Sequence, residues 1–231
     1  MNHPWDPSTF ENRLREVGAR AYHDKHPFHE KMNEGKLSRE AVTGWVVNRF
    51  YYQQSIPRKD AAIMANMPSR EVRRLWLHRI TDHDGIPGGD DGGIESWLRL
   101  GEACGVSREA LLDPLNVEPG VRSSVDAYVA FARTQPWPVA VASSLTEMFV
   151  PNLMAKRLDA FERHYRWIDP AGLDYFRRRL VQAPRDSSEG LRLTLEHCNT
   201  RELQLAAVGA LSFKCNLLWA LLDAIAMRYE N

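Results

Sequence analysis

Cysteine is scarce in this chain, and the few cysteines present form no recognisable framework. Cys104, Cys198 and Cys215 are odd in number, scattered among 231 residues, and include no Cys-x-x-Cys pair. This usage argues against a disulfide scaffold and against a structural zinc site. We therefore expect a protein of a reducing cytoplasm.

A surplus of charge of either sign is also lacking. The 30 lysine and arginine residues cancel the 30 aspartate and glutamate residues, so no global field attracts nucleic acid or an anionic membrane. The N-terminal residues show no basic segment followed by an apolar one, and the apolar run near the C-terminus is interrupted by Lys214, Asn216 and Asp223. We expect no export signal, no membrane span and no nucleic-acid partner.

Strand signals are almost absent as well. No alternating run of valine, isoleucine and threonine is bounded by hairpin turns, and there is no internal repeat, low-complexity tract or linker. A chain of this length can bury roughly 70% of its surface in one domain. We predict an all-α fold in which residues 1–231 form a single compact bundle of about eight helices.

Capping residues and prolines predict where the first helices begin and end. Ser8 and Glu11 have the spacing of a capping box and predict the start of a first helix. Ser38 is the expected start of a second helix, which Pro57 should end or kink. Ser55 is then placed to cap the segment that follows.

The rest of the chain shows the same helical periodicity. Further helices are expected over 69–80, 94–103, 125–133, 139–165 (with Pro151 inside), directly after Asp169-Pro170, over 187–197, and from Thr200 onward. Gly105 is the expected C-terminal stop for the helix over 94–103. The glycine-rich stretch 84–93 is expected to be a loop.

Five cations interrupt apolar helical stretches, where a charge is costly. They are Arg49, Arg79, Arg157, Arg179 and Lys214. Most lysines and arginines on helices are solvated, and a long side chain can also reach water from the edge of a bundle. Lys214 is apolar on both flanks for a full turn, which favours burial. We expect these cations to remain unpaired inside the bundle until an anionic ligand binds.

Helical spacing places other polar groups on the same faces as these cations. Tyr52 and Gln53 share a face with Arg49, and His83 lies one turn after Arg79. Tyr175, Arg179 and Gln182 form a similar line, and Glu147 precedes Pro151, Met154 and Arg157 at helical spacing. Turned inward, these faces would meet at one polar cavity between helices.

Motifs for metals, phosphates and covalent catalysis are weak or missing. His23, His26 and His29 are spaced by three residues, which spreads their rings around a helix instead of converging them on a metal. The loop 88–93 is glycine-rich but acidic and lacks a phosphate-binding lysine. His83, flanked by Asp82 and Asp84, is either a helix cap or a base. The pattern favours a site without a metal.

The chain also carries a series of long, ordered motifs. They are Arg49-Phe50-Tyr51-Tyr52-Gln53, Ser55-Ile56-Pro57, Lys59-Asp60-Ala61-Ala62-Ile63-Met64-Ala65-Asn66, Asp82-His83-Asp84-Gly85, Gly92-Gly93-Ile94-Glu95, Trp97-Leu98-Arg99-Leu100-Gly101-Glu102 and Ser143-Ser144-Leu145-Thr146-Glu147. These motifs resemble the pyrroloquinoline-quinone synthase family over essentially the whole chain. The resemblance implies a haem-oxygenase-like helical bundle, a homodimer, and a bacterial cytoplasmic oxidase.

The resemblance further implies a reaction and a set of roles. The family closes a ring and removes eight electrons from a hydroquinoline tricarboxylate precursor, giving pyrroloquinoline quinone, with O₂ consumed, H₂O₂ released, and no metal or redox cofactor. By position, the implied catalytic residues are His83, Tyr175 and Arg179. The implied substrate-binding residues are Tyr22, His23, Arg49, Tyr52, Gln53, Arg79, Tyr128, Glu147, Arg157 and Lys214.

One position departs from the family pattern, and two other functions remain open. Some relatives have a histidine where this chain has Met154, whose thioether cannot carry charge. A haem- or iron-dependent enzyme of the same fold, with His23 as axial ligand, is one alternative. A carrier that binds an anionic quinone without chemistry is the other.

Overall fold

The computed structural model describes residues 3–230, and every regular element in that range is helical. The α-helices are α1 (Pro7–Ala21), α2 (Pro27–Asn33), α3 (Arg39–Ala65), α4 (Arg70–Trp76), α5 (His78–Asp84), α6 (Gly92–Ala103), α7 (Arg108–Leu112), α8 (Pro119–Thr134), α9 (Trp137–Ser143), α10 (Val150–His164), α11 (Asp174–His197) and α12 (Arg201–Tyr229). Four 3₁₀ turns are η1 (His23–Lys25), η2 (Pro114–Asn116), η3 (Ser144–Phe149) and η4 (Pro170–Leu173). The all-α prediction is confirmed, with twelve α-helices within residues 3–230 where about eight were expected.

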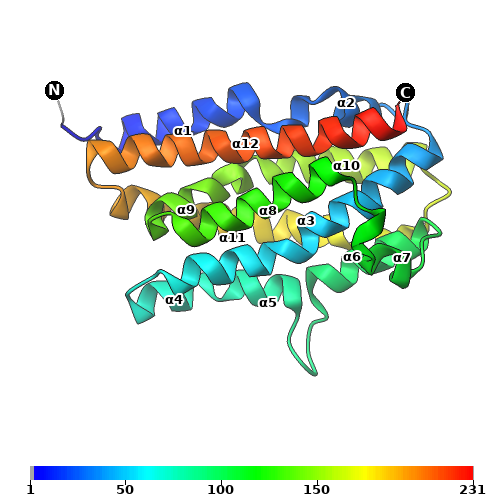
Figure 1. Ribbon diagram of the computed structural model, residues 1–231, viewed down its shortest axis with the longest axis horizontal. Helices are drawn as coiled ribbons and strands as arrows, with labels where there is room; N and C mark the ends of the chain where they lie inside the picture. The colour runs from blue at the N-terminus through cyan, green and yellow to red at the C-terminus, as the bar shows by residue number, and fades with distance from the viewer. Residues whose placement is uncertain (1–2, 231) are drawn as a thin grey trace.

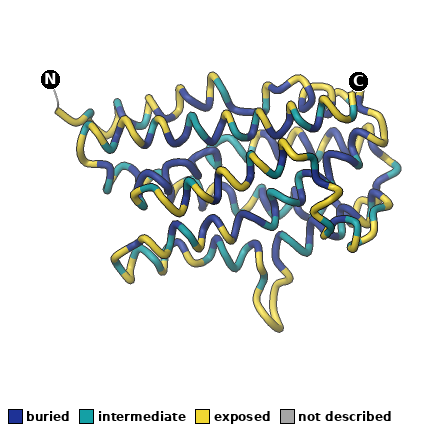
Figure 2. Tube along the Cα trace, in the orientation of Figure 1, coloured by how far each residue is buried: buried dark blue, intermediate teal, exposed yellow. Residues whose placement is uncertain are grey.

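The long helices lie side by side along the long axis of the molecule (Figure 1). α12 packs against α1, α8 and α9, while α3 packs against α5, α6 and α8. α11 contacts α10 and η3 and also reaches α6 and α9. The buried residues form the inward faces of these helices, and the loop between α5 and α6 projects from the bundle as an exposed arm (Figure 2).

The C-terminal helix is the most apolar segment of the chain. By length and composition, α12 could cross a membrane. In the structure it is a core helix, with Leu211, Leu218 and Ile225 buried against the neighbouring helices. Lys214, also buried, faces the interior of the bundle from the same helix.

Two prolines that should interrupt helices lie inside continuous ones. α3 runs through Pro57, so the helix does not end there, and Ser55 donates its hydroxyl to the Tyr51 carbonyl at 2.8 Å instead of capping a new helix. α11 runs through Pro184, which joins the helix expected after Asp169-Pro170 to the one expected over 187–197. Each proline removes one helical hydrogen bond, and packing of the long helices against the core compensates for that loss.

Other boundaries also differ from the sequence prediction. The Asp6 carboxylate caps α1 by accepting from the amides of Ser8 and Thr9, so the expected capping box of Ser8 and Glu11 is wrong. The helix predicted over 69–80 is broken at Leu77 into α4 and α5. The helix predicted over 139–165 is instead α9, η3 and α10. The expected starts at Ser38 and Thr200 are confirmed, because both hydroxyls accept from backbone amides.

Two exposed glycines predict opposite effects of the same substitution. Gly105 ends α6 at φ +87°, a conformation that L-residues rarely adopt, although a Cβ there would meet only the far end of Arg39. Gly209 lies inside α12, and a Cβ there would meet nothing within 4 Å. We expect Gly105→Ala to lower the free energy of unfolding by about 1–2 kcal/mol and Gly209→Ala to raise it by about 0.5–1 kcal/mol. Urea denaturation of both variants tests this, and equal signs would contradict it.

Candidate active site

A partly enclosed cavity lies between the helices of the bundle, and most of the long helices contribute residues to its wall. Its wall consists of Tyr22, His23, His29, Trp45, Arg49, Tyr52, Ile56, His83, Trp97, Thr146, Glu147, Val150, Leu153, Met154, Arg157, Tyr175, Phe176, Arg179, Leu218, Leu221 and Leu222. The cavity has a volume of about 60 Å³. Pockets that bury drug-sized ligands typically span about 300–1,000 Å³, so a multi-ring ligand requires wall side chains to move.

Most of the residues singled out from the sequence converge on this cavity. Those on its wall are Tyr22, His23, Arg49, Tyr52, His83, Glu147, Arg157, Tyr175 and Arg179. The other four, Gln53, Arg79, Tyr128 and Lys214, are buried but lie outside the wall. Met154 also lies on the wall, as its helical spacing from Glu147 predicted.

A short hydrogen-bond chain orients His83 on the wall. The Arg49 guanidinium donates to the Gln53 side-chain oxygen at 3.5 Å, and this contact turns the Gln53 amide nitrogen toward His83, whose Nδ1 it meets at 2.8 Å. Because an amide N–H donates, His83 Nδ1 is an acceptor and its Nε2 carries the proton. Burial, reinforced by the Arg179 and Arg79 charges, holds the pKa of His83 well below its ordinary value. The neutral ring therefore presents an N–H donor.

This arrangement bears on the expected role of His83 as a base. Nε2 can accept a proton only after the ring changes tautomer, which requires Gln53 to present its oxygen to Nδ1 instead. That flip would break the contact of Gln53 with Arg49. Gly93 lies beside the pair, since a Cβ there would be 3.0 Å from His83 Nδ1 and 3.2 Å from Gln53 Nε2. The backbone at Gly93 therefore packs closely against the side chains of Gln53 and His83.

Two of the five expected unpaired cations have carboxylate partners inside the protein. Arg179 meets Glu147 at 2.5 Å and Asp186 at 3.1 Å. Arg79 meets Asp60 at 3.4 Å and both Glu147 and Asp186 at 3.6 Å. Burial alone would lower their pKa values, but these carboxylates hold both pKa values above the ordinary range. The expectation of unpaired charge is wrong for Arg79 and Arg179.

Asp60 and Asp186, which the sequence analysis did not identify, anchor this ion-pair network. Both side chains are almost fully buried, and each follows a cation in the sequence, Lys59 and Arg185 respectively. An adjacent acid and base usually indicate a solvated surface, so the pattern gave no reason to place them inside. Only the crossing of α3, α5 and α11 brings them to the arginines.

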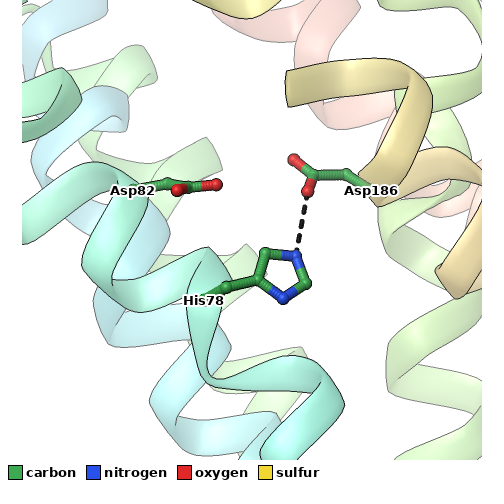
Figure 3. Close-up of side chains that lie close together, drawn as sticks. All are labelled: His78, Asp82 and Asp186. Atoms are coloured by element: carbon green, nitrogen blue, oxygen red, sulfur yellow. Dashed lines mark hydrogen bonds and ion pairs between the residues drawn. The ribbon is translucent and has the colours of Figure 1, made fainter. Parts of the chain in front are cut away.

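The Asp186 side of the network includes a group with metal-ligand chemistry. His78, Asp82 and Asp186 bring their donor atoms within 4.8 Å of one another, and His78 Nε2 lies 3.2 Å from Asp186 (Figure 3). The carboxylates are already bound by guanidinium groups, because Arg185 pairs with both Asp82 and Asp186. A cation there would compete with arginines for every carboxylate, so the group serves to join α5 to α11.

The spaced histidines likewise do not converge. His26 turns away from the cavity to bond Asp223 at 3.0 Å and packs its ring on Trp219. His23 and His29 remain on the cavity wall with their rings 4.9 Å apart. The three rings therefore form no common ligand set.

Three cations near the cavity have no carboxylate partner within residues 3–230. Arg49 lies over the rings of Tyr52 and Trp97, at 4.1 and 5.0 Å. Arg157 lies 4.8 Å over the Trp45 ring, with its Nε and Nη2 buried and without hydrogen-bond partners. Burial lowers the pKa of Arg157 to about 9. These cations are held by ring faces, which stabilise charge only in part.

Lys214 is the third of these cations. Its Nζ lies 3.6 Å from the centre of the Tyr128 ring and 4.0 Å from that of Tyr52, and the two rings are nearly parallel. Burial, with added repulsion from Lys59 and Arg49, holds the pKa of Lys214 well below its ordinary value. A ligand carboxylate near this amine would favour its charged form.

Lys214 and Lys59 predict a matched pair of stability effects. Lys59 is also buried but pairs with Asp60 at 2.5 Å and Ser144 at 3.0 Å. We expect Lys214→Met to raise the free energy of unfolding by about 1–3 kcal/mol, because a buried amine without an anion is lost. Lys59→Met should lower it by about 3 kcal/mol, because Asp60 loses its shortest ion pair. Denaturation curves test both signs.

The same lysine predicts a pH dependence. Since the folded pKa of Lys214 is depressed below 10.5, the unfolded chain binds more protons than the folded protein between the two values. The penalty of burying Lys214 therefore shrinks as pH rises toward 10.5. The stability advantage of Lys214→Met should shrink in parallel, and an advantage that grows with pH would contradict this account.

The fold and the cavity define a helical-bundle protein with an internal, cation-rich binding site. Residues 11–224 match the model of the TENA/THI-4/PQQC family, and the chain belongs to that family. It is similar to the pyrroloquinoline-quinone synthase of Pseudomonas aeruginosa (strain LESB58), with 57% identity over 225 residues, covering 97% of this chain and 89% of that protein. The synthase of Pseudomonas entomophila (strain L48) is 55% identical over 227 residues, covering 98% and 90%.

Solved structures share the fold at much lower sequence identity. A TenA homolog from Pseudomonas syringae pv. tomato superposes with a TM-score of 0.75 at 15% identity, covering 95% of this chain and 92% of that one. A domain with a heme oxygenase-like fold from Shewanella denitrificans gives 0.75 at 14% identity, covering 96% and 91%. These two similarities support the expected haem-oxygenase-like bundle.

Proposed function

We propose that this protein catalyses the last step of pyrroloquinoline-quinone formation. In this step, the ring of a hydroquinoline tricarboxylate precursor closes and eight electrons pass to O₂, with H₂O₂ released. The identity of 57% over 97% of the chain to proteins named pyrroloquinoline-quinone synthase supports this assignment. The observation in the structure that carries it is the set of cations beside the cavity without carboxylate partners, Arg49, Arg157 and Lys214.

The charge balance of the interior fits a ligand with several acid groups. The interior holds six cationic side chains and three carboxylates, namely Arg49, Lys59, Arg79, Arg157, Arg179 and Lys214 against Asp60, Glu147 and Asp186. Three cations thus remain for ligand carboxylates. A bound carboxylate would give each of them a charge-assisted hydrogen bond, a stronger interaction than its present contact with an aromatic ring. Tyr22, His23, Tyr52 and Tyr128 would complete the binding site, with Gln53 and Arg79 acting from behind the wall.

The proposed chemistry uses groups on one side of the cavity. His83 would move protons as the substrate ring is oxidised: its Nε2–H can donate in the resting tautomer, and Nε2 can accept once Gln53 has turned its oxygen to Nδ1. Arg179 and Tyr175, both on the wall, would stabilise negative charge that develops on reduced oxygen in a dry site. The reduced substrate ring would itself supply the electrons, so we propose catalysis without a metal or redox cofactor.

We further propose that the enzyme acts as a homodimer in the bacterial cytoplasm. The three cysteines are free and buried, which fits a reducing compartment. Size-exclusion chromatography with light scattering tests the dimer. A monomer at assay concentration would overturn that part of the proposal.

Turnover of the precursor is the direct test of the function. Purified protein incubated under air with the ring-open precursor should yield the quinone chromophore and H₂O₂, and no product should form without O₂. A carrier would bind product without forming it from the precursor. A haem- or iron-dependent enzyme would show a Soret band or stoichiometric iron, and chelation would abolish its activity.

A further inference from the structure

His29 is a buried cavity residue to which neither the sequence motifs nor the proposed reaction assigns a role. It lies on α2, is 2% exposed, and forms part of the cavity wall beside His23 and Trp45. Pro27 at the start of α2 and the His26 side chain, which accepts from the Phe28 amide, set the helix in position. The ring thus faces the cavity from a capped helix.

One hydrogen bond determines which nitrogen of His29 carries the proton. Nδ1 lies 3.0 Å from the His23 carbonyl oxygen, which can only accept. Nδ1 is therefore protonated, and because burial and the Arg157 charge hold the pKa of His29 well below its ordinary value, the ring is neutral. Nε2 then has a free lone pair. It is buried and has no hydrogen-bond partner within residues 3–230.

His29 and His83 consequently offer opposite polarity to the same cavity. The Gln53 amide makes His83 present an N–H, whereas the His23 carbonyl makes His29 present a lone pair. Of the two neutral rings, only His29 is an acceptor in its resting tautomer.

Arg157 supplies unpaired donors at the same end of the cavity. Its guanidinium packs on Trp45, as does the His29 ring, and Arg157 is the charge that most depresses the pKa of His29. Among the described residues 3–230, Arg157 Nε and Nη2 are buried without hydrogen-bond partners, and neither bonds His29. Leaving a buried donor or acceptor unpaired is costly. Two adjacent side chains that carry such atoms indicate a site that a ligand completes.

We propose that His29 and Arg157 together bind one part of the substrate, in which a carboxylate stands next to an N–H or O–H group. Arg157 donates to the carboxylate and His29 Nε2 accepts from the neighbouring donor. His29 is then a substrate-orienting residue, and it discriminates against ligands that lack the donor. This inference rests on the proposed function, because it names which substrate groups this end of the cavity recognises.

Two amide substitutions separate the two nitrogens of His29. In His29→Asn the side-chain amide nitrogen can replace Nδ1 and keep the bond to the His23 carbonyl, but the acceptor at Nε2 is lost. In His29→Gln the amide oxygen can replace Nε2, but the carbonyl bond is lost. We expect His29→Asn to raise the precursor KM and the dissociation constant for pyrroloquinoline quinone by roughly tenfold, with kcat changed less. His29→Gln should stay within about threefold of wild type.

The opposite order would overturn the inference. If His29→Asn binds product like wild type while His29→Gln lowers Tm, the ring serves only the His23 carbonyl. A second measurement needs no variant: ¹⁵N NMR of histidine-labelled wild-type protein should show His29 Nε2 unprotonated, with a shift when pyrroloquinoline quinone binds. A protonated Nε2 in the free protein would also overturn it. Failure of wild-type turnover with intact product binding would contradict the proposed reaction alone, since the binding comparison still tests His29.

Discussion

Replacing His83 with asparagine is expected to slow quinone formation by about 10²–10⁴-fold. Asparagine can keep an acceptor for the Gln53 amide, so the hydrogen-bond chain from Arg49 through Gln53 is preserved. What is lost is Nε2, the nitrogen that faces the cavity and would carry protons. The affinity for pyrroloquinoline quinone should change by less than about threefold, because other residues supply the charge that binds it.

The measurement is quinone absorbance against time, paired with product binding by fluorescence quenching. His83→Ala should slow the reaction at least as much and also leave Gln53 without its partner. His78→Asn is a suitable control, because His78 is bonded to Asp186 on the far side of the network and is not on the cavity wall. Unchanged turnover in His83→Asn would show that another group moves the protons.

Replacing Asp186 with asparagine is expected to lower the free energy of unfolding by about 3 kcal/mol. The carboxylate is 2% exposed and contacts Arg79, Arg179 and Arg185 as well as His78. Breaking a buried ion pair from one side typically costs about 3–5 kcal/mol. We expect the lower end of that range, because Arg79 and Arg179 keep other carboxylate partners.

A control and an acid titration sharpen this prediction. Asp82→Asn removes an ion pair with the 43% exposed side chain of Arg185 and should cost at most about 1 kcal/mol. Burial alone would raise the pKa of Asp186, but Arg79, His78 and Arg179 hold it below its ordinary value of 3.8. The ionised group therefore stabilises the fold above that pH and loses this contribution as pH falls below it. The gap between wild type and Asp186→Asn should narrow under acid, and a gap that widens would contradict it.

The sequence predicted most of the helical segments correctly, but it did not predict where one helix continues and where it is broken. Apolar spacing and capping residues such as Ser38 and Thr200 depend on local geometry, so they indicated real helix starts. Pro57 was expected to end or kink its helix, but α3 runs on through it, and the separate helices expected before and after Pro184 form one helix, α11. A proline inside a helix costs about 3 kcal/mol of stability. Burial of a long helix face against neighbouring helices stabilises the fold by more than that.

The sequence also predicted much of the candidate site. Spacing on helix faces predicted a shared cavity, and most of the named residues lie on its wall. The sequence signal at His29 is its three-residue spacing from His26 and His23, which is a metal-binding pattern and gives no indication of a hydrogen-bond acceptor. Its acceptor nitrogen depends on a bond to the His23 carbonyl, and backbone geometry at a turn between helices is not visible in side-chain spacing.

By itself, the sequence determined that the chain is helical and that cations enter its interior, because both follow from which residues recur every three or four positions. It also determined the family, because long ordered motifs extend along nearly the whole chain. Only the tertiary structure decided which cations are neutralised. Arg79 and Arg179 meet Asp60, Glu147 and Asp186, while Arg49, Arg157 and Lys214 meet aromatic rings. The physical reason is that ion pairing depends on distances of a few ångströms between helices remote in sequence.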